Sequence, residues 1–256
     1  MNSGKIRVET DAEHPNVLVV TLDNPPVNAL TTAMYREITE IFRSAGKAGE
    51  RCVVLTAEGS RAFCAGSDKN EHIELSPGTA VSRSRMLRDC FGAIRDCEIP
   101  VIAAVGGPVL GGGIALVGSA DVVVASDNAA FGVPEINVGV MGGTKHMARL
   151  VPEKVLRWLA FSGESLPAAD LARLGGVVRL TTRDALLPEA MAMAGRIAAK
   201  GPSAVRLMKE ILNLSELGDL ASGYHIEQLG TAIMSGIPES KEAARAVRER
   251  RAPNFA

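Results

Sequence analysis

The sequence predicts an α/β fold, because short apolar strands alternate with glycine-containing turns and amphipathic helices over residues 1–199. The clearest unit begins at Val101 to Val105, an apolar run that is typical of a strand buried on both faces. The glycines at 111–113 then open a helix that runs toward Ala120. From residue 200 to residue 256 the pattern is nearly all helical, which predicts a small C-terminal helical subdomain.

The other elements are predicted from the two-residue periodicity of strands and the 3.6-residue periodicity of helices. Strands are expected at 5–10, 17–22, 52–56 and 122–125, the first two joined as a hairpin. Helices are expected at 31–45, before Pro100, and at 151–161, 167–174, 184–199, 203–214 and 240–250. Segments 106–110 and 129–135 are expected to be turns, and 69–82 a mobile polar loop.

The overall composition is that of a soluble globular protein and excludes several classes of function. The 256 residues are 46% hydrophobic and 22% charged, with a formal net charge of -1. This balance gives no electrostatic reason for binding nucleic acid or an anionic membrane, and aromatic residues, at 4%, are too few for base stacking. The four cysteines form no C-x-x-C pair, so no metal site is indicated and a reducing cytoplasmic location is expected. The N-terminus lacks the apolar core of a signal peptide.

Two turns rich in small residues are the candidate chemical site. Each follows a predicted strand, one at Ala65 to Ser67 and the other at Gly111 to Gly113, where a helix begins. A helix N-terminus presents unpaired N–H groups, and two such turns facing one another would stabilise a negatively charged oxygen. The glycines match neither the phosphate-loop nor the dinucleotide-binding pattern. Ser67 has no motif-placed histidine and aspartate partners that would make it a nucleophile.

A succession of short motifs identifies the family that the chain resembles. In order they are NPPVNAL at 24–30, FCAGSD at 63–68, PVIAAV at 100–105, the triple glycine, Ala120-Asp121, FGVPE at 131–135 and GGT at 142–144. Together they resemble the crotonase, or enoyl-CoA hydratase/isomerase, family, and the likeness runs from about Val17 to Phe255. The resemblance implies a spiral of ββα turns, acyl-CoA substrates and a trimer or dimer of trimers assembled through the C-terminal helices. Coenzyme A would enter as part of the substrate, with no metal or tightly bound cofactor.

The resemblance also implies roles for individual residues. The backbone N–H groups of Ser67 and Gly112 would hold the thioester oxygen, and Glu135 would move protons. The residues expected to line the acyl and coenzyme A site are Val27, Ala29, Arg61, Ala65, Asp68, Ala115 and Arg250.

One departure from the family pattern bears on the reaction. Two-glutamate hydratases of the family have a carboxylate where this chain has Ala115, so Glu135 is left as the single acid/base. One carboxylate suffices to move a proton between two carbons, which slightly favours double-bond isomerisation over hydration. Hydrolysis, decarboxylation or ring opening of a CoA ester stays open, as does an acyl-CoA- or RNA-binding role without catalysis. Glu71, His72 and His146 are weaker candidates for a second proton-transferring group, and His225 is expected at a surface or interface.

Overall fold

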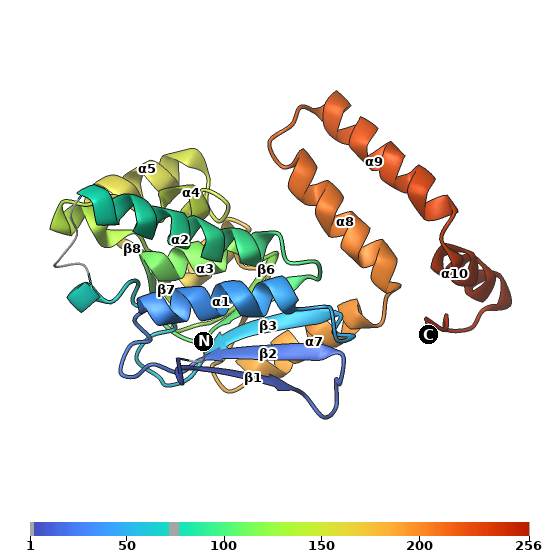
Figure 1. Cartoon of the computed structure of the whole chain (residues 1–256), viewed down its shortest axis with the longest axis horizontal. Helices are drawn as coiled ribbons and strands as arrows, with labels where there is room; N and C mark the ends of the chain where they lie inside the picture. Colours follow the sequence, from blue (N-terminus) through green and yellow to red (C-terminus); the bar gives the residue numbers. More distant parts are fainter. Residues whose placement is uncertain (1–2, 72–76, 256) are drawn as a thin grey trace.

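The computed structural model describes residues 3–71 and 77–255, and it is built on a six-stranded sheet (Figure 1). The strand order is β1-β2-β3-β4-β6-β9. β1 pairs antiparallel to β2, as the predicted hairpin requires, and all the other pairs are parallel. The bounds are β1 Ile6–Thr10, β2 Val17–Leu22, β3 Cys52–Ala57, β4 Val101–Val105, β6 Val122–Ser126 and β9 Arg179–Thr181.

Helices cover both faces of this sheet. On one face α1 (Thr32–Ser44), α2 (Pro77–Arg95) and α3 (Gly112–Ser119) enclose the larger core, which includes Phe42 and Ile94. On the other face α7 (Leu186–Ala198) packs on alternate residues of the same strands, such as Val54 and Ile102. Burial of both faces explains why β2 and β4 are continuous apolar runs.

A second, three-stranded sheet lies where the sequence predicted only turns. It consists of β5 (Val109–Leu110), β7 (Ala130–Gly132) and β8 (Ser165–Pro167), in that order. The turns expected at 106–110 and 129–135 were therefore wrong in part. Strands of two or three residues flanked by glycine and proline are too short to show a two-residue periodicity, so the pattern concealed them.

The remaining helices of the core connect these strands. They are η1 Lys69–Glu71, η2 Pro134–Val138, α4 Thr144–Met147, α5 Glu153–Ser162 and α6 Ala168–Arg173. The mobile loop predicted at 69–82 is shorter than expected, because η1 begins it and α2 already starts at Pro77. Residues 72–76 lie outside the described residues.

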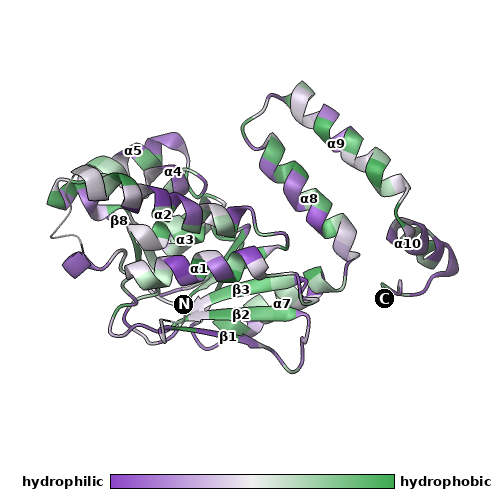
Figure 2. Ribbon diagram, in the orientation of Figure 1, coloured by the Kyte–Doolittle hydropathy of each residue, from purple (hydrophilic) through white to green (hydrophobic). Residues whose placement is uncertain are grey.

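Three helices, α8 (Pro202–Ser215), α9 (Leu220–Ser235) and α10 (Pro238–Glu249), form the C-terminal part. In Figure 1 α9 stands away from the sheet beside α8, and Figure 2 shows hydrophobic residues along both helices. The sequence did not predict α9 as a separate helix, because Gly223 and Gly230 interrupt its apolar pattern. In the described ranges, no helix combines the length and hydropathy needed to cross a membrane.

A buried lysine anchors α8 to the core. Lys209 is 6% exposed, and its Nζ donates to the carbonyl of Ile99 at 3.0 Å and to Asp121 Oδ2 at 2.8 Å. The same carboxylate oxygen accepts from Val101 N at 2.7 Å. One ion pair therefore ties the C-terminal helices to the beginning of β4 and to the residue that precedes β6.

Candidate active site

The amino terminus of α3 is the centre of the candidate site. Gly111, the residue before the helix, has a φ of +52°, a conformation that favours glycine. A Cβ at this position would lie 2.8 Å from Glu135 Oε1, so a larger residue would also displace that carboxylate. Gly113 lies so close to the carbonyl of Cys64 that a Cβ would be 2.7 Å from it. The glycines thus allow the helix terminus to approach both Glu135 and the neighbouring turn.

Backbone hydrogen bonds hold the second turn, residues 63–68, against this helix terminus. Leu110 N donates to Cys64 O at 2.9 Å, and Leu30 N donates to Gly66 O at 2.8 Å. Asp68 N returns a hydrogen bond to Leu30 O at 2.9 Å. The turn is consequently fixed between the chain at residue 30 and the short strand β5.

The backbone amides of Ser67 and Gly112 lie close together, and their role as oxyanion donors stays a prediction. A Cβ on Gly112 would lie 3.4 Å from Ser67 N, and a Cβ on Gly66 would lie 3.3 Å from Gly112 N. Within residues 3–71 and 77–255, neither amide donates a hydrogen bond to the protein. Two free donors beside a helix N-terminus are the arrangement that stabilises a developing oxyanion.

Glu135 lies on η2, directly beside these amides. Its Oε1 is 3.0 Å from the position of a Cβ on Gly142, because the chain turns back on the carboxylate after η2. Its Oε2 is buried and has no hydrogen-bond partner among the described residues. Burial raises the pKa of Glu135 above the ordinary glutamate value. A carboxylate whose pKa is raised toward neutrality is a better proton acceptor and donor than an exposed one.

Ala115, which stands where a second carboxylate would be expected, is a buried residue of α3. It is 1% exposed, its carbonyl accepts from Ser119 Oγ at 2.7 Å, and its methyl group is part of the packed interior of α3. Glu71 is engaged elsewhere, since its Oε2 accepts from Thr32 N and Oγ1, both at 2.7 Å. Glu135 is thus the carboxylate placed beside the two amides.

Of the histidines considered from sequence, the two that the structure describes have other surroundings than Glu135. His146 packs edge-on against Phe91, with ring centroids 5.2 Å apart, and burial together with the charge of Arg149 lowers its pKa. His225 is exposed on α9. His72 lies outside the described residues.

The predicted coenzyme A contacts lie near the amides, and several of their backbone groups already have partners. Val27 O accepts from Ala65 N at 3.0 Å, and Ala29 O accepts from Asn24 Nδ2 at 2.6 Å. Asp68 Oδ1 accepts from the backbone of η1 at 2.9 Å. The structure therefore gathers Val27, Ala29, Ala65 and Asp68 around one turn, where their role in binding stays a prediction.

The two predicted arginines differ in position. Arg61 is exposed on the loop that follows the carboxyl end of β3, the same end at which the two turns meet. Arg250 ends α10, and the tail beyond it returns to Arg51, whose Nη2 donates to Phe255 O at 3.1 Å. Because Arg51 precedes β3, this tail lies at the end of the strands opposite to the two turns, and in Figure 1 the C-terminus lies near α10, away from α3.

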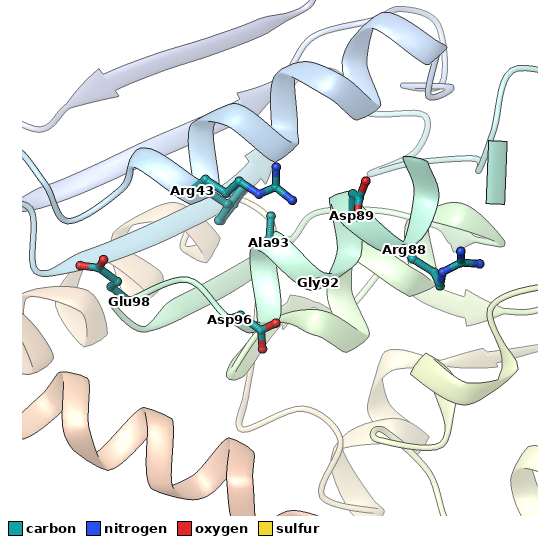
Figure 3. Close-up of a pocket in the computed structure, with 8 residues that line it drawn as sticks. Arg43, Arg88, Asp89, Gly92, Ala93, Asp96 and Glu98 are labelled. Atoms are coloured by element: carbon teal, nitrogen blue, oxygen red, sulfur yellow. The ribbon is translucent and has the colours of Figure 1, made fainter. Parts of the chain in front are cut away.

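A groove elsewhere on the surface is distinct from this site. It has a volume of about 340 Å³ and lies between α1 and α2, lined by charged residues that include Arg43, Arg88 and Asp89 (Figure 3). None of the predicted site residues lines it. It therefore plays no part in the chemistry considered for Glu135.

Sequence reasoning missed Tyr35, which lies beside the converging amides. Its hydroxyl oxygen is 2.6 Å from Ser67 Oγ and 2.8 Å from the position of a Cβ on Gly112. Tyr35 is the residue after Met34 on α1 and does not belong to a recognised motif. The signal that could have indicated its burial is helical spacing: Tyr35 lies two turns before Phe42 on α1 and therefore on the same apolar face.

Comparisons with known proteins show the family to which the chain belongs. The enoyl-CoA hydratase/isomerase family model matches residues 12–256. A Mycobacterium tuberculosis (7aS)-7a-methyl-1,5-dioxo-2,3,5,6,7,7a-hexahydro-1H-indene-carboxyl-CoA hydrolase is 39% identical over 86% of this chain and 90% of its own. A putative enoyl-CoA hydratase/isomerase of Bacillus subtilis is 31% identical over 93% of this chain and 94% of its own.

Solved structures show the same relationship. The enoyl-CoA hydratase of Mycobacterium smegmatis superposes with a TM-score of 0.92, at 32% identity, and the match covers 98% of each chain. The family match, the relatives and the shared fold lead to one conclusion: the chain belongs to the enoyl-CoA hydratase/isomerase, or crotonase, family.

Proposed function

We propose that the protein binds an acyl-CoA thioester with its carbonyl oxygen between the amides of Ser67 and Gly112, and that Glu135 transfers protons at the adjacent carbon. The observation that carries this proposal is the carboxylate of Glu135: its buried Oε2 has no partner in the described structure, and its Oε1 lies 2.8 Å from the Cβ position of Gly111, the residue before one of the two unpaired amides. A buried polar atom without a partner is costly, so a substrate that supplies the partner explains why it is kept.

The proposed chemistry needs one base. Glu135 takes a proton from C2 of the acyl group, and the electron pair of that C–H bond moves into the thioester carbonyl to give an enolate. The two amides stabilise the negative oxygen. Return of the proton to C4 of a 3-enoyl group completes a shift of the double bond to C2. This isomerisation is our first candidate, because Ala115 stands where a second carboxylate would be expected to share the activation of a water.

Hydrolysis of a bulkier CoA ester is the second candidate. The family resemblance implies that Ala115, whose methyl group is buried, stands at the position where two-glutamate hydratases have a carboxylate. The Mycobacterium tuberculosis relative is named as the hydrolase of a CoA ester with a bicyclic dioxo acyl group. In this reaction Glu135 takes a proton from water and the resulting hydroxide attacks the thioester carbonyl carbon, whose oxygen becomes negatively charged between the two amides. The C–S bond then breaks, and the coenzyme A sulfur leaves with the proton that Glu135 returns, which yields the free acid and the free thiol.

A panel of CoA esters separates these reactions. The purified protein is incubated with 3-hexenoyl-CoA, crotonyl-CoA and a cyclic 1,3-diketone CoA ester. Double-bond migration, water addition and free thiol are measured in parallel. We expect one of the three reactions to be catalysed. We expect Glu135→Gln to lower its rate by a factor of about 10²–10⁴, the usual contribution of a positioned acid/base.

The matched control is Glu164→Gln, which neutralises an exposed carboxylate on the segment after α5. It is expected to leave the rate within a factor of two of the wild type. Equal turnover by the wild type and Glu135→Gln would remove Glu135 from the mechanism. Binding of CoA esters without turnover of any would instead support a binding role without catalysis.

We also propose that residues 200–256 mediate self-association into a trimer or a dimer of trimers. α9 carries large apolar side chains that stay exposed in the single chain: Leu220, Tyr224, Leu229 and Ile233. Exposed apolar patches of this kind mark interaction surfaces. Sedimentation equilibrium is expected to give a trimer or hexamer for the wild type and smaller species for the double variant Leu229→Glu, Ile233→Glu. A monomeric wild type would contradict this assignment.

A further inference from the structure

A pair of hydroxyl groups borders the amide site on the side away from Glu135. Tyr35 Oη and Ser67 Oγ are 2.6 Å apart, and both lie near Gly112, at 2.8 and 3.5 Å from the position of its Cβ. Glu135 Oε1 lies instead beside Gly111, at 2.8 Å from the position of its Cβ. The helix terminus thus has a carboxylate at one residue and two hydroxyls at the next.

The phenol of Tyr35 is rigidly held. The residue is 0% exposed, its ring meets that of Phe91 edge-on with centroids 6.0 Å apart, and the Arg83 guanidinium lies 5.9 Å from its ring centroid. Burial raises the pKa of Tyr35 well above its ordinary value, so the group stays a protonated phenol. It therefore always has a proton to donate.

Burial decides the direction of the Tyr35–Ser67 hydrogen bond. Among the described residues, Ser67 Oγ is the partner of Tyr35 Oη. If Ser67 were the donor, the phenolic proton would be buried without an acceptor, which costs about 1–3 kcal/mol. Ser67 is partly exposed, so its own proton can reach solvent or a substrate. Tyr35 is consequently the donor in this hydrogen bond, and the Ser67 hydroxyl proton is available to another acceptor.

The free proton of Ser67 is a third donor beside the two amides. A thioester oxygen has two lone pairs, which the N–H groups of Ser67 and Gly112 would already occupy. In a 3-oxoacyl thioester the two carbonyl oxygens can point in the same direction. Two donors on one residue, Ser67 N–H and Ser67 O–H, suit such a pair of oxygens and the enolate charge that they share.

We propose that Ser67 Oγ, oriented by Tyr35, hydrogen-bonds a second oxygen on the acyl chain and selects CoA esters that carry an oxo group at C3. This inference rests on the proposed function, since it assumes the thioester oxygen between the two amides. Ser67 contacts the substrate in this arrangement, and Tyr35 is a positioning residue that acts through it.

The test compares two CoA esters that differ by one oxygen. Dissociation constants for acetoacetyl-CoA and butyryl-CoA are measured by calorimetry with the wild type, Tyr35→Phe, Ser67→Ala and the double variant. We expect the wild type to bind acetoacetyl-CoA about tenfold more tightly, the value of one hydrogen bond of about 1.4 kcal/mol. The ratio of the dissociation constant for butyryl-CoA to that for acetoacetyl-CoA is expected to fall toward one in each single variant. It is expected to fall no further in the double variant.

The control variant is Thr39→Val, which removes another buried hydroxyl from α1, one that donates to Tyr35 O at 2.8 Å. It is expected to keep the wild-type ratio. A purely structural role of Tyr35 would weaken both esters equally and leave the ratio unchanged, which would overturn the inference. Equal binding of the two esters by the wild type would also overturn it while leaving the proposed function standing. Failure of both esters to bind would overturn the proposed function itself.

Discussion

Two charged groups that bury polar atoms in this protein differ in how those atoms are compensated: Lys209 is buried as a whole residue, and Glu135 is partly buried. Lys209 donates both to Asp121 and to a backbone carbonyl, whereas Glu135 keeps one buried oxygen without a partner in the described structure. Burying a charged atom costs free energy in both cases, and among the described residues the lysine has partners that compensate this cost whereas Glu135 Oε2 has none. The difference supports a structural role for Lys209 and the substrate-binding role that we propose for Glu135.

The position of each group agrees with this distinction. Lys209 joins α8 to the beginning of β4, at the end of the strands away from the two turns. Glu135 lies at the opposite end, beside the terminus of α3. A substitution at either residue should therefore change one property, stability or activity, in preference to the other.

Lys209→Met is expected to have the largest effect on stability. Removing the ammonium leaves Asp121 without its cationic partner, and breaking a buried pair in this way costs about 3–5 kcal/mol. The side chain of Asp121 is 24% exposed and gains some hydration, so we expect a loss of about 3 kcal/mol in the free energy of unfolding. Urea unfolding measures it.

The double variant Lys209→Met, Asp121→Asn sharpens this prediction. An asparagine oxygen can still accept from Val101 N, and no uncompensated charge remains. The double variant is therefore expected to be more stable than Lys209→Met alone. An equal or larger loss would show that Lys209 acts through packing of its stem and not through its charge. Turnover per folded molecule should stay near that of the wild type in both.

The pH dependence of activity probes Glu135 in the same way. If ionised Glu135 is the base, kcat/KM rises with pH as the carboxyl loses its proton, and it falls about tenfold per pH unit below the pKa. Burial raises this pKa, so the midpoint is expected above the ordinary glutamate value of about 4.3. A midpoint at or below that value would contradict the role of burial. His146→Gln, which removes a second titrating group, is expected to leave this rise of kcat/KM with pH unchanged.

Much of the candidate site could be predicted from the sequence, because it is carried by short motifs whose spacing is visible. The glycines before α3, the turn ending at Ser67 and the FGVPE segment with Glu135 were all identified, and the structure brings them together. Their proximity follows from backbone pairing between neighbouring strands and turns. The replacement of a carboxylate by Ala115 was equally visible, since it is a single position within a motif.

The parts that sequence could not predict depend on contacts between side chains far apart in the chain. Tyr35 and Ser67 are 32 residues apart, and neither residue alone indicates that their hydroxyls meet. Lys209 is a lysine in the middle of an amphipathic helix, which ordinarily predicts an exposed side chain. Its burial depends on Asp121, 88 residues away, and on how α8 packs, which no local periodicity encodes.

The smallest expected effect is on the stability of Glu135→Gln, and its sign is opposite to that of Lys209→Met. Because the folded state raises the pKa of Glu135, the stability associated with its protonated form is complete below the ordinary glutamate pKa and is lost as pH rises through the folded-state value. Glutamine carries no charge and avoids that loss. Near neutral pH, urea unfolding should therefore show Glu135→Gln to be more stable than the wild type, and the gain should shrink toward zero as the pH approaches 4. A variant that is less stable than the wild type at neutral pH would mean that the carboxylate is compensated within the fold, and its unpartnered oxygen would then no longer distinguish it from Lys209.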